Sequence, residues 1–325
     1  MIHKLSVYRA TGVDPYHNIA TEKFLLETVA AGECILYLWQ NQNTVVIGRN
    51  QNAWAECRAS LLEAEGGHLA RRLSGGGAVF HDLGNLNFTF IMHEEDYDLA
   101  KQLSVIQTAC AAAGIQAERS GRNDLLVNGM KFSGNAFYHS QGKAYHHGTL
   151  LIDADMEKLS RYLTPSKAKL ASKGVASVRS RVMNLNTYNK QLTCALMAQY
   201  MTEAFQSVYA LPAAIQPQPD AQQLRQDAQM LCSWQWLYGE NLQADFSWED
   251  RFPWGGFLLE IQAVSGKIEA VRVYTDAMDW YLPAKIETAL AGCRFSPEEM
   301  CRALERALED RAVFNDIARL ITTQA

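Results

Sequence analysis

The 325-residue sequence lacks any run of about 18 or more apolar residues, the length that a membrane-spanning helix requires. Its N-terminus also lacks an apolar stretch followed by a small-residue cleavage site, so no export signal is expected. These two absences predict a cytoplasmic protein that does not bind a membrane.

The cysteines are few, and their spacing suits neither disulfide bonds nor a zinc site. The seven cysteines are odd in number, scattered, and never form a C-x-x-C pair. Neither a disulfide framework nor a zinc site is therefore predicted, and most of the thiols are expected to be buried. Positive charge is not in excess either, because the formal net charge is −5, which argues against nucleic-acid binding. Any anionic substrate must be held by basic residues gathered locally.

The remaining composition, 48% hydrophobic and 20% charged, is that of an ordinary globular protein. The length exceeds that of a typical single domain and predicts one large domain and one small domain. Prolines and glutamines in residues 212–223 mark a change of composition typical of a connector. We place the catalytic domain at residues 1–245 and an accessory domain at residues 246–325.

Hydrophobic periodicity predicts an α+β first domain built largely on antiparallel strands. Helices are predicted near residues 17–31, 58–65, 99–113, 156–163 and 191–209, and strands near residues 34–39, 44–48, 86–92, 131–138 and 145–152. The polar residues Asn41–Asn43 predict that the first two strands pair as a hairpin, and Ser140–Gly142 predict another hairpin. In the tail, a hairpin turning at Ser265-Gly266 and a helix opening at Ser296-Pro297 predict a small α+β domain.

The most informative segment is glycine-rich and runs from Arg71 to Asp82. Its three consecutive glycines remove side chains where a backbone must approach a ligand, and they permit conformations that present amide N–H groups to an anion. Arg71 and Arg72, directly before them, could pair with phosphate or carboxylate oxygens. The spacing is neither that of a P-loop nor G-x-G-x-x-G. A flexible turn flanked by solvated arginines is the alternative interpretation.

A second segment places a lysine beside a carboxylate. Asn128-Gly129 predicts a tight hairpin turn, which brings Asp124 and Lys131 near each other on two paired strands. A lysine there is a compact cation able to contact a carboxylate and an α-phosphate at once. A solvated lysine on a strand is the alternative.

A third segment, Lys158–Val182, contains seven basic residues and no acidic one. So local a basic run predicts a site for polyphosphate or for an acidic partner surface, and a solvated charged loop is the alternative. The small residues between Lys173 and Arg181 suit a loop that closes over a ligand. His146 and His147 give a weaker signal, because adjacent residues on a strand point to opposite faces and at most one lines any given site.

Taken together, these segments resemble the lipoate-protein ligase A family over nearly the whole chain. The resemblance rests on Asp14-Pro15, Asn18–Ala20, Thr44–Arg49, Gln51-Asn52, Arg71–Asp82, Gly121–Asp124, Lys131–Gly134, His146–Leu151, Lys169–Val182 and Arg251–Gly256. It implies an α+β fold, with a mixed, largely antiparallel sheet in a catalytic domain of the biotin/lipoate protein ligase type. A small C-terminal α+β domain would follow.

The resemblance also implies an activity. The implied enzyme activates lipoate with MgATP to lipoyl-AMP and transfers the lipoyl group to a lysine of acceptor (lipoyl) domains of 2-oxoacid dehydrogenase complexes and of the glycine cleavage H protein. ATP and Mg²⁺ would enter as a substrate complex, and no bound prosthetic group is expected. The implied partners are lipoic acid and the acceptor domains, with no nucleic acid and no membrane.

Individual residues take roles from the same resemblance. Lys131 is the implied catalytic residue, contacting the lipoyl carboxylate and the adenylate phosphate, and Asp124 is the implied Mg²⁺ ligand. The residues implied to bind lipoate or ATP are Arg71, Arg72, Ser74, Gly75, Gly76, Gly77, Ala78, Val79, Phe80, His81, Asn123, Asp124, Lys131, His147, Gly148 and Thr149. The implied adenylate-binding loop contains Lys169, Lys173, Gly174, Val175, Ser177, Val178, Arg179 and Arg181.

Three other functions share parts of this pattern. An octanoyl or lipoyl transferase of the same superfamily would carry its acyl group on a cysteine, but none occurs between Cys110 and Cys194, the span that contains the matching loops. A biotin ligase fits the arginine–glycine pattern less well. A non-catalytic lipoate-binding or carrier-domain-binding protein would have no need of intact Arg72, Asp124 and Lys131.

Overall fold

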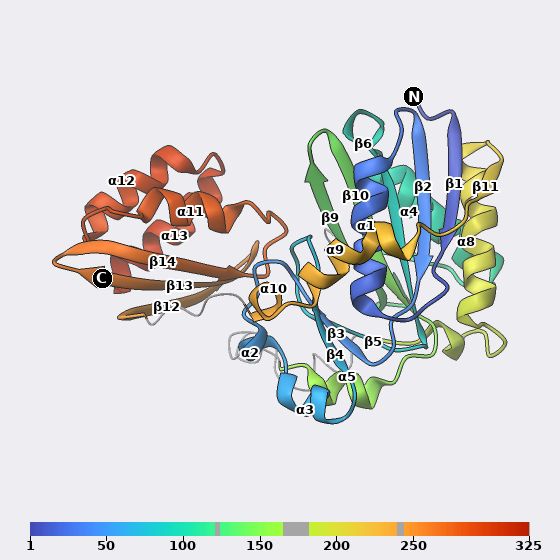
Figure 1. Cartoon of the computed structure of the whole chain (residues 1–325), viewed down its shortest axis with the longest axis horizontal. Helices are drawn as coiled ribbons and strands as arrows, with labels where there is room; N and C mark the ends of the chain where they lie inside the picture. The colour runs from blue at the N-terminus through green and yellow to red at the C-terminus, as the bar shows by residue number, and fades with distance from the viewer. Residues whose placement is uncertain (121–123, 165–181, 239–243, 325) are drawn as a thin grey trace.

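The computed structural model describes residues 1–120, 124–164, 182–238 and 244–324. These residues form two bodies (Figure 1): a large part, made by the described residues up to Tyr238, and a small part, made by those from Ala244 onward. Both contain helices and strands, so the predicted α+β class is confirmed. None of the described helices is both long and apolar enough to cross a membrane.

The described residues of the large part contain a sheet of eight strands and a second sheet of three. In spatial order the first sheet consists of β11 (Ala213–Ile215), β1 (Lys4–Arg9), β2 (Glu33–Trp39), β6 (Asn85–His93), β10 (Lys143–Leu151), β9 (Met130–Ser140), β8 (Asp124–Val127) and β7 (Glu118–Ser120). β1 runs parallel to both its neighbours, whereas the other pairs are antiparallel, as predicted. The second sheet places β3 (Thr44–Ile47) between β4 (His68–Arg71) and β5 (Val79–His81).

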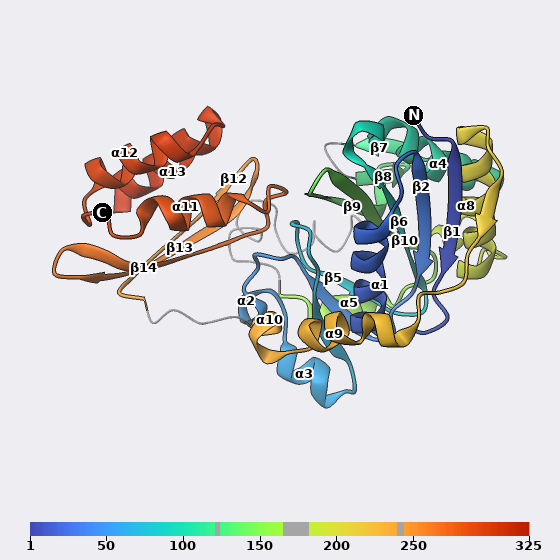
Figure 2. The same cartoon turned by 45° about the horizontal axis from the view of Figure 1, so that its top comes forward.

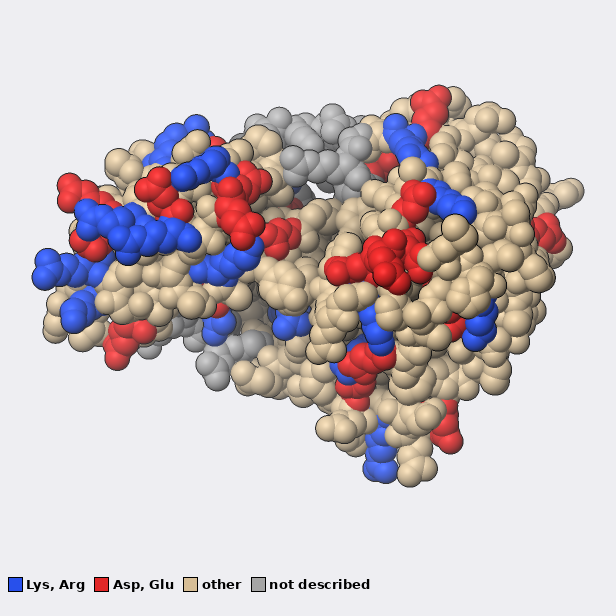
Figure 3. Space-filling view, turned by 90° about the horizontal axis from the view of Figure 1, so that it is seen from above, with Lys and Arg blue, Asp and Glu red and all other residues tan. Residues whose placement is uncertain are grey.

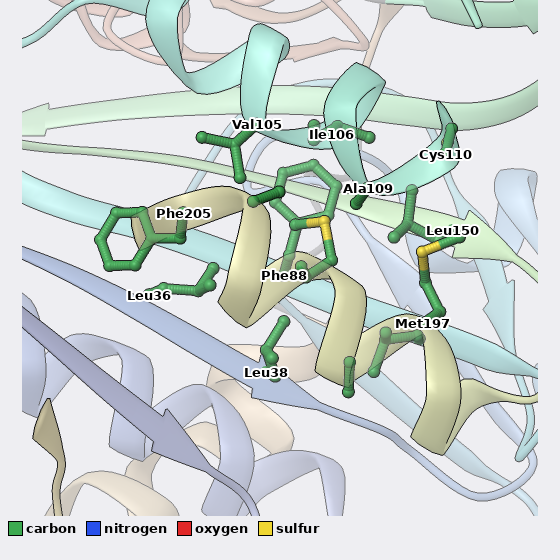
Figure 4. Packing of buried hydrophobic residues seen from close by; sticks show 14 of the residues in the cluster. Leu36, Leu38, Phe88, Val105, Ile106, Ala109, Cys110, Leu150, Met197 and Phe205 are labelled. Carbon is green, nitrogen blue, oxygen red and sulfur yellow. The ribbon is translucent and has the colours of Figure 1, made fainter. Parts of the chain in front are cut away.

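Helices cover both faces of the eight-stranded sheet. On one face, Val105 of α4 and Phe205 of α8 pack with Phe88 of β6 in the largest apolar cluster (Figure 4). On the other face, Ile19 of α1 and Leu224 of α9 belong to a second cluster. These helices are α1 (Pro15–Thr28), α4 (Leu99–Ala112), α8 (Cys194–Tyr209) and α9 (Ala221–Leu231), and the shorter ones are α2 (Ala53–Glu56), α3 (Ala59–Ala64), α5 (Met156–Tyr162), α10 (Trp234–Tyr238), η1 (Glu94–Asp96) and η2 (Leu185–Thr187).

Local signals position several of these elements as predicted. The Asp98 side chain accepts a hydrogen bond from the Lys101 N–H and thereby caps α4, which ends just before Gly114. The turn between β8 and β9 has positive φ angles at Asn128 (50°) and Gly129 (77°), as the favoured two-residue hairpin turn requires. β9 and β10 are likewise joined by a tight turn, with Ser140 opposite Lys143.

The predicted hairpin around Asn41–Asn43 is wrong. β2 lies between β1 and β6, so both of its edges are occupied, and β3 pairs instead with β4 and β5. The polar residues between β2 and β3 serve tertiary contacts rather than a hairpin turn. Asn41 is fully buried and contacts the side chains of Asn18 and His81.

The small part has an apolar core of its own. β12 (Phe246–Phe252), β13 (Gly255–Val264) and β14 (Lys267–Thr275) form an antiparallel sheet, and α11 (Leu282–Leu290), α12 (Pro297–Ala307) and α13 (Arg311–Gln324) lie over one face of it (Figure 2). The predicted turn at Ser265-Gly266 and the predicted helix after Ser296 are both present, with the Ser296 side chain accepting from the Glu299 N–H. The tail is therefore the small α+β body that the sequence predicted.

Candidate active site

A cavity of about 430 Å³ lies where the glycine-rich segment, the eight-stranded sheet and the small part meet. The space-filling view shows a hollow between the small and the large part (Figure 3). The lining residues are Trp39, Val46, Arg72, Gly76, Gly77, Ala78, Val79, His81, Asn87, Asp124, Lys131, Gly134, Asn135, Ala136, His147, Gly148, Thr149, Arg251, Pro253, Trp254, Gly255, Asp276 and Met278. The cavity thus gathers segments from both ends of the chain.

The floor of the cavity is a row of residues in register across five strands. Trp39 of β2 lies opposite Asn87 of β6, which lies opposite Thr149 of β10. The Gly134 N–H of β9 donates to the Thr149 hydroxyl (3.3 Å), and Gly134 lies opposite Asp124 of β8. Four strand spacings separate the two ends, so the floor runs for about 19 Å. A long, narrow ligand fits such a floor.

One end of this floor carries a lysine and a carboxylate. Lys131 Nζ lies 2.7 Å from Asp124 Oδ1, and each side chain is about one-third exposed. The predicted proximity of these two residues is therefore confirmed. Their exposure leaves both groups free to exchange partners when a charged ligand enters, because the pair is not locked in the core.

Arg72 lines the cavity, but most of its N–H groups donate hydrogen bonds to other atoms of the protein. Its guanidinium donates to the carbonyls of Val46 (3.2 Å), Gly75 (2.7 Å) and Gly77 (2.9 Å), and its Nε also reaches the Ser74 hydroxyl (3.1 Å). Burial lowers the pKa of Arg72 to about 10, so the side chain stays cationic at neutral pH. Arg72 therefore holds the backbone of the glycine-rich segment in its conformation.

Arg71 does not line the cavity. Its guanidinium donates to five backbone carbonyls, those of Gly48, Arg49, Gln51, Trp236 and Leu237. Of the other residues singled out from the sequence, Ser74, Gly75 and Phe80 are also absent from the lining of this cavity. The sequence interpretation gave Arg71 and Arg72 the same role, but in the structure only Arg72 lines the cavity.

Replacing Arg71 with lysine is expected to lower the free energy of unfolding by about 3 kcal/mol, because an ammonium has only three donors and leaves at least two buried carbonyls without a partner. Denaturant unfolding measures this loss. Arg225→Lys, at an exposed position on α9, is the matched control and should change stability by less than about 0.5 kcal/mol. Equal stability of the two variants would contradict a structural role for Arg71.

The glycine-rich segment is also where the small part docks. The Gly76 N–H donates to the Ala277 carbonyl (3.3 Å), and Gly76 has a φ of +90°. A Cβ at Gly75 would lie 2.4 Å from the Ala277 oxygen, so any side chain there would push the small part away. Nearby, the Asn50 amide donates to the Trp280 carbonyl (2.8 Å). These glycines therefore permit a close approach between two parts of the protein.

The two adjacent histidines lie on opposite faces of β10, as predicted. His147 lines the cavity, with Nδ1 2.8 Å from Glu22 Oε1 and Nε2 2.8 Å from the Ser74 hydroxyl. The order Glu22–His147–Ser74 is that of a hydrolase relay, but Ser74 is fully buried outside the lining and also accepts from Arg72. This relay holds the glycine-rich segment against the sheet.

His146 is buried on the far face of β10, between the side chains of Gln102 and Asn135. Burial, with a smaller effect of His147, lowers the pKa of His146 from 6.5 to about 3. Between these two pH values the unfolded chain binds a proton that the folded chain does not, so the free energy of unfolding falls as the pH falls from 6.5 to about 3.

The variant His146→Gln is therefore expected to lose stability more gradually with acid than the parent protein over that pH range. Denaturant unfolding at several pH values measures the slope, which should decrease by up to one proton equivalent. Parallel curves for the two proteins would show that His146 does not titrate on unfolding.

The small part supplies the outer wall of the cavity. Arg251 and Asp276 line it and form an ion pair (3.4 Å), and Pro253, Trp254 and Met278 lie beside them. The sequence drew attention to the Arg251 region only through its resemblance and proposed no site residue there. Trp39, Val46 and Asn87 were likewise missed, and the signal that could have found Asn87 is a polar side chain that is buried within a strand.

Several predicted site residues lie outside the described part of the chain. They are Asn123, Lys169, Lys173, Gly174, Val175, Ser177, Val178, Arg179 and Arg181. Within the described ranges, no group of three or more His, Cys, Asp or Glu side chains is arranged to hold a metal ion. All seven cysteines lie in those ranges and are free thiols, and Cys34, Cys57 and Cys110 are buried.

The chain matches known proteins along most of its length. Residues 14–206 match the family described as "Lipoyl protein ligase A/B catalytic domain", and residues 241–320 match "Bacterial lipoate protein ligase C-terminus". The chain is 38% identical over 310 residues to "Lipoate-protein ligase A" of Psychrobacter cryohalolentis, covering 91% of each protein. It is 36% identical over 312 residues to "Lipoate-protein ligase A" of Bdellovibrio bacteriovorus, covering 93% of this chain and 92% of the relative.

A solved structure is similar to the whole fold. The crystal structure of P. falciparum LipL1 in complex with lipoate superposes with a TM-score of 0.85 at 26% sequence identity. The superposition covers 98% of this chain and 99% of that protein. The similarity therefore includes the placement of the small part beside the large one.

Proposed function

The chain belongs to the lipoate-protein ligase A family, and we propose that it activates lipoate with MgATP to lipoyl-AMP and then transfers the lipoyl group to one lysine of an acceptor domain. The proposed acceptors are the lipoyl domains of 2-oxoacid dehydrogenase complexes and the glycine cleavage H protein. ATP and Mg²⁺ act as a substrate complex, without a bound prosthetic group.

The observation that carries the proposal is the change in charge along the cavity floor, which has an ion pair at one end only. Lys131 and Asp124 lie at one end of the row, whereas Trp39 lies at the other, beside the apolar Val46. An elongated carboxylic acid fits this arrangement, with its carboxylate at Lys131 and its carbon chain along the floor toward Trp39. Burial at the Trp39 end stabilises the bound carbon chain of the ligand by removing its apolar surface from water.

The proposed chemistry proceeds in two steps. A carboxylate oxygen of lipoate attacks the α-phosphorus of MgATP, which forms lipoyl-AMP and releases pyrophosphate. The amine of the acceptor lysine then attacks the acyl carbon, which forms an amide, loses a proton and releases AMP. No covalent bond to the enzyme is needed in either step.

The residues act mainly by position and charge. The first step brings two anions together, so Lys131 is proposed to hold the carboxylate and the α-phosphate side by side. Arg72 keeps the glycine-rich segment in shape through its bonds to backbone carbonyls. Asp124 is proposed to contact the Mg²⁺ of the nucleotide, since Mg²⁺ is commonly held by one or two carboxylates together with substrate phosphates.

Residues 1–245 are proposed as the catalytic unit and residues 246–325 as an accessory unit that completes the site. Arg251, Trp254 and Met278 reach the cavity from the accessory unit, and the Ala277 carbonyl accepts a hydrogen bond from Gly76. The accessory unit therefore stabilises the conformation in which the glycine-rich segment and the cavity wall lie together.

Lipoate-dependent exchange of labelled pyrophosphate into ATP tests the proposal directly. The exchange requires a reversible adenylation step, so neither a transferase nor a non-catalytic binder shows it. Intact-mass analysis of an acceptor domain then detects the added lipoyl group. A folded protein that binds lipoate but exchanges no pyrophosphate would be a binder rather than a ligase.

A transferase that carries the acyl group on a cysteine finds no support in the cavity. The described lining residues include no cysteine, and Cys110 lies on the buried face of α4, in the apolar core. Burial raises the pKa of the Cys110 thiol to about 12, which keeps it protonated and a poor nucleophile at neutral pH.

A further inference from the structure

The small part brings a positively charged side chain to the cavity. Arg251 lies on β12, directly before Phe252, which packs in the core of the small part. Because successive side chains of a strand point to opposite faces, Arg251 leaves the face of the sheet that the helices do not cover. Its side chain is 25% exposed and lines the cavity. A ligand in the cavity can therefore reach this guanidinium.

Two neighbours hold the Arg251 guanidinium at the cavity wall. Gly256 of β13 lies opposite Arg251 in register, and a Cβ there would lie 3.2 Å from the Arg251 Nη1. The Asp276 carboxylate lies 3.4 Å from the same nitrogen and accepts a hydrogen bond from the Gly256 N–H (2.6 Å). Asp276 directly precedes Ala277, whose carbonyl accepts from Gly76. The ion pair thus lies beside the glycine-rich segment.

The described lining residues with a permanent positive charge are Arg72, Lys131 and Arg251. Most N–H groups of Arg72 already donate to protein atoms, and Lys131 contacts Asp124 at 2.7 Å. Within the described ranges, the Arg251 guanidinium has one hydrogen-bond partner, Asp276, at 3.4 Å. That distance is longer than the roughly 2.7–2.9 Å typical of a charge-assisted hydrogen bond. Arg251 therefore has N–H groups left to donate to an anionic ligand.

MgATP differs from lipoyl-AMP by its β- and γ-phosphates, which add negative charge to the nucleotide. We propose that Arg251 binds these two phosphates and stabilises the pyrophosphate that leaves in the adenylation step. The planar fork of a guanidinium can donate to two phosphate oxygens at once, which suits this role. The inference rests on the proposed function, since it takes the α-phosphate of the nucleotide to lie at Lys131.

The adenylation step explains why a cation is needed there. A bond forms between a carboxylate oxygen of lipoate and the α-phosphorus, and the bond from the α-phosphorus to the bridging oxygen of the β-phosphate breaks. The electron pair of the broken bond stays on the bridging oxygen, so negative charge accumulates on the leaving pyrophosphate. A guanidinium already in place stabilises this charge as it develops. The transfer step contains no pyrophosphate, so Arg251 acts in adenylation alone.

Two activities measured on one variant test this role. In Arg251→Gln, lipoate-dependent pyrophosphate exchange should fall about a hundredfold, with a raised KM for pyrophosphate, whereas transfer from supplied lipoyl-AMP should change little. Arg251→Lys keeps the charge without the fork and should lose less exchange. This lysine variant decides the question if Arg251→Gln does not fold. Unchanged exchange, or an equal loss of exchange and transfer, overturns the inference.

Nucleotide binding gives a second measurement that needs no reaction. By isothermal titration calorimetry without lipoate, Arg251→Gln should bind MgATP about tenfold more weakly than the parent protein and AMP equally well, because AMP lacks the two outer phosphates. The matched control is Arg272→Gln on β14 of the same sheet. Arg272 pairs with Glu287 (3.6 Å) and is absent from the described lining, so both affinities should stay unchanged. Equal weakening of MgATP and AMP in Arg251→Gln would overturn the inference.

The two measurements also separate this inference from the proposed function. A parent protein that binds MgATP but shows no lipoate-dependent exchange contradicts the proposed function, and the comparison of MgATP with AMP still tests Arg251. A parent protein that ligates lipoate, with MgATP affinity and exchange unchanged in Arg251→Gln, contradicts only the role of Arg251. In that second case, the ion pair with Asp276 serves the structure of the small part.

Discussion

Replacing Lys131 with alanine is expected to leave a folded protein whose lipoate adenylation is lowered by about a hundred- to a thousandfold. The side chain is about one-third exposed and pairs with Asp124, so its removal should change stability by less than about 1 kcal/mol. Its removal also leaves the Asp124 carboxylate without its cation. The cavity end would then repel both the carboxylate and the phosphates that must meet there.

Pyrophosphate exchange and thermal unfolding, measured together, test this expectation. Lys143→Ala is the matched control, because Lys143 is a half-buried lysine on the neighbouring strand β10 and does not line the cavity. Lys131→Arg keeps the charge in a different shape and should retain more activity than the alanine variant. Near-normal exchange in a stable Lys131→Ala protein would remove Lys131 from the site.

Deleting the chain from Trp248 onward is expected to lower adenylation from free lipoate and ATP by about a hundredfold, and to affect transfer from supplied lipoyl-AMP much less. The small part has its own core, so the deletion leaves the largest apolar cluster of the large part intact and removes only Trp280 from the cluster on the other face of the sheet. It removes Arg251 and Asp276 from the cavity wall and the Ala277 carbonyl from Gly76. The residues proposed to contact the adenylate all precede residue 183, so the truncated protein should still bind a preformed adenylate.

A substitution in the full-length chain tests the same idea without a truncation. Gly75→Ala places a Cβ 2.4 Å from the Ala277 oxygen and should displace the small part, lowering adenylation more than transfer. Gly12→Ala is the control, because no atom lies within 4 Å of the added Cβ. Equal loss of both activities in the deletion and in Gly75→Ala would make the small part a general requirement for folding.

Several predictions based on neighbouring residues agreed with the structure. The predicted helix from Leu99 is present because Asp98 caps it and its apolar face meets the sheet. The turn at Asn128-Gly129 brings Lys131 to Asp124, a contact that needs only one hairpin. About half of the candidate site could be found in this way. The glycine-rich segment and the lysine hairpin can each be recognised from a short stretch of sequence.

Predictions that depended on contacts between residues far apart in the sequence were less successful. Asn41–Asn43 suggested a hairpin, but β2 pairs with β1 and β6, whose positions depend on the whole sheet. Arg71 and Arg72 are neighbours in sequence, yet one binds backbone carbonyls away from the cavity and the other lines it. No local pattern distinguishes two adjacent arginines. Their side chains point to opposite faces of the chain at the end of β4, and only the tertiary structure shows which face meets the cavity.

The sequence by itself determined the α+β class, the turns at Asn128-Gly129 and Ser265-Gly266, the lysine–aspartate contact and the resemblance to a ligase family, because each depends on local chemistry or on motifs along the chain. Only the tertiary structure decided that Trp39, Asn87 and Thr149 form one row of the cavity floor, since strand register is a property of paired backbones. It also decided that Gly75 and Gly76 lie against the small part, because that contact joins segments far apart in the chain.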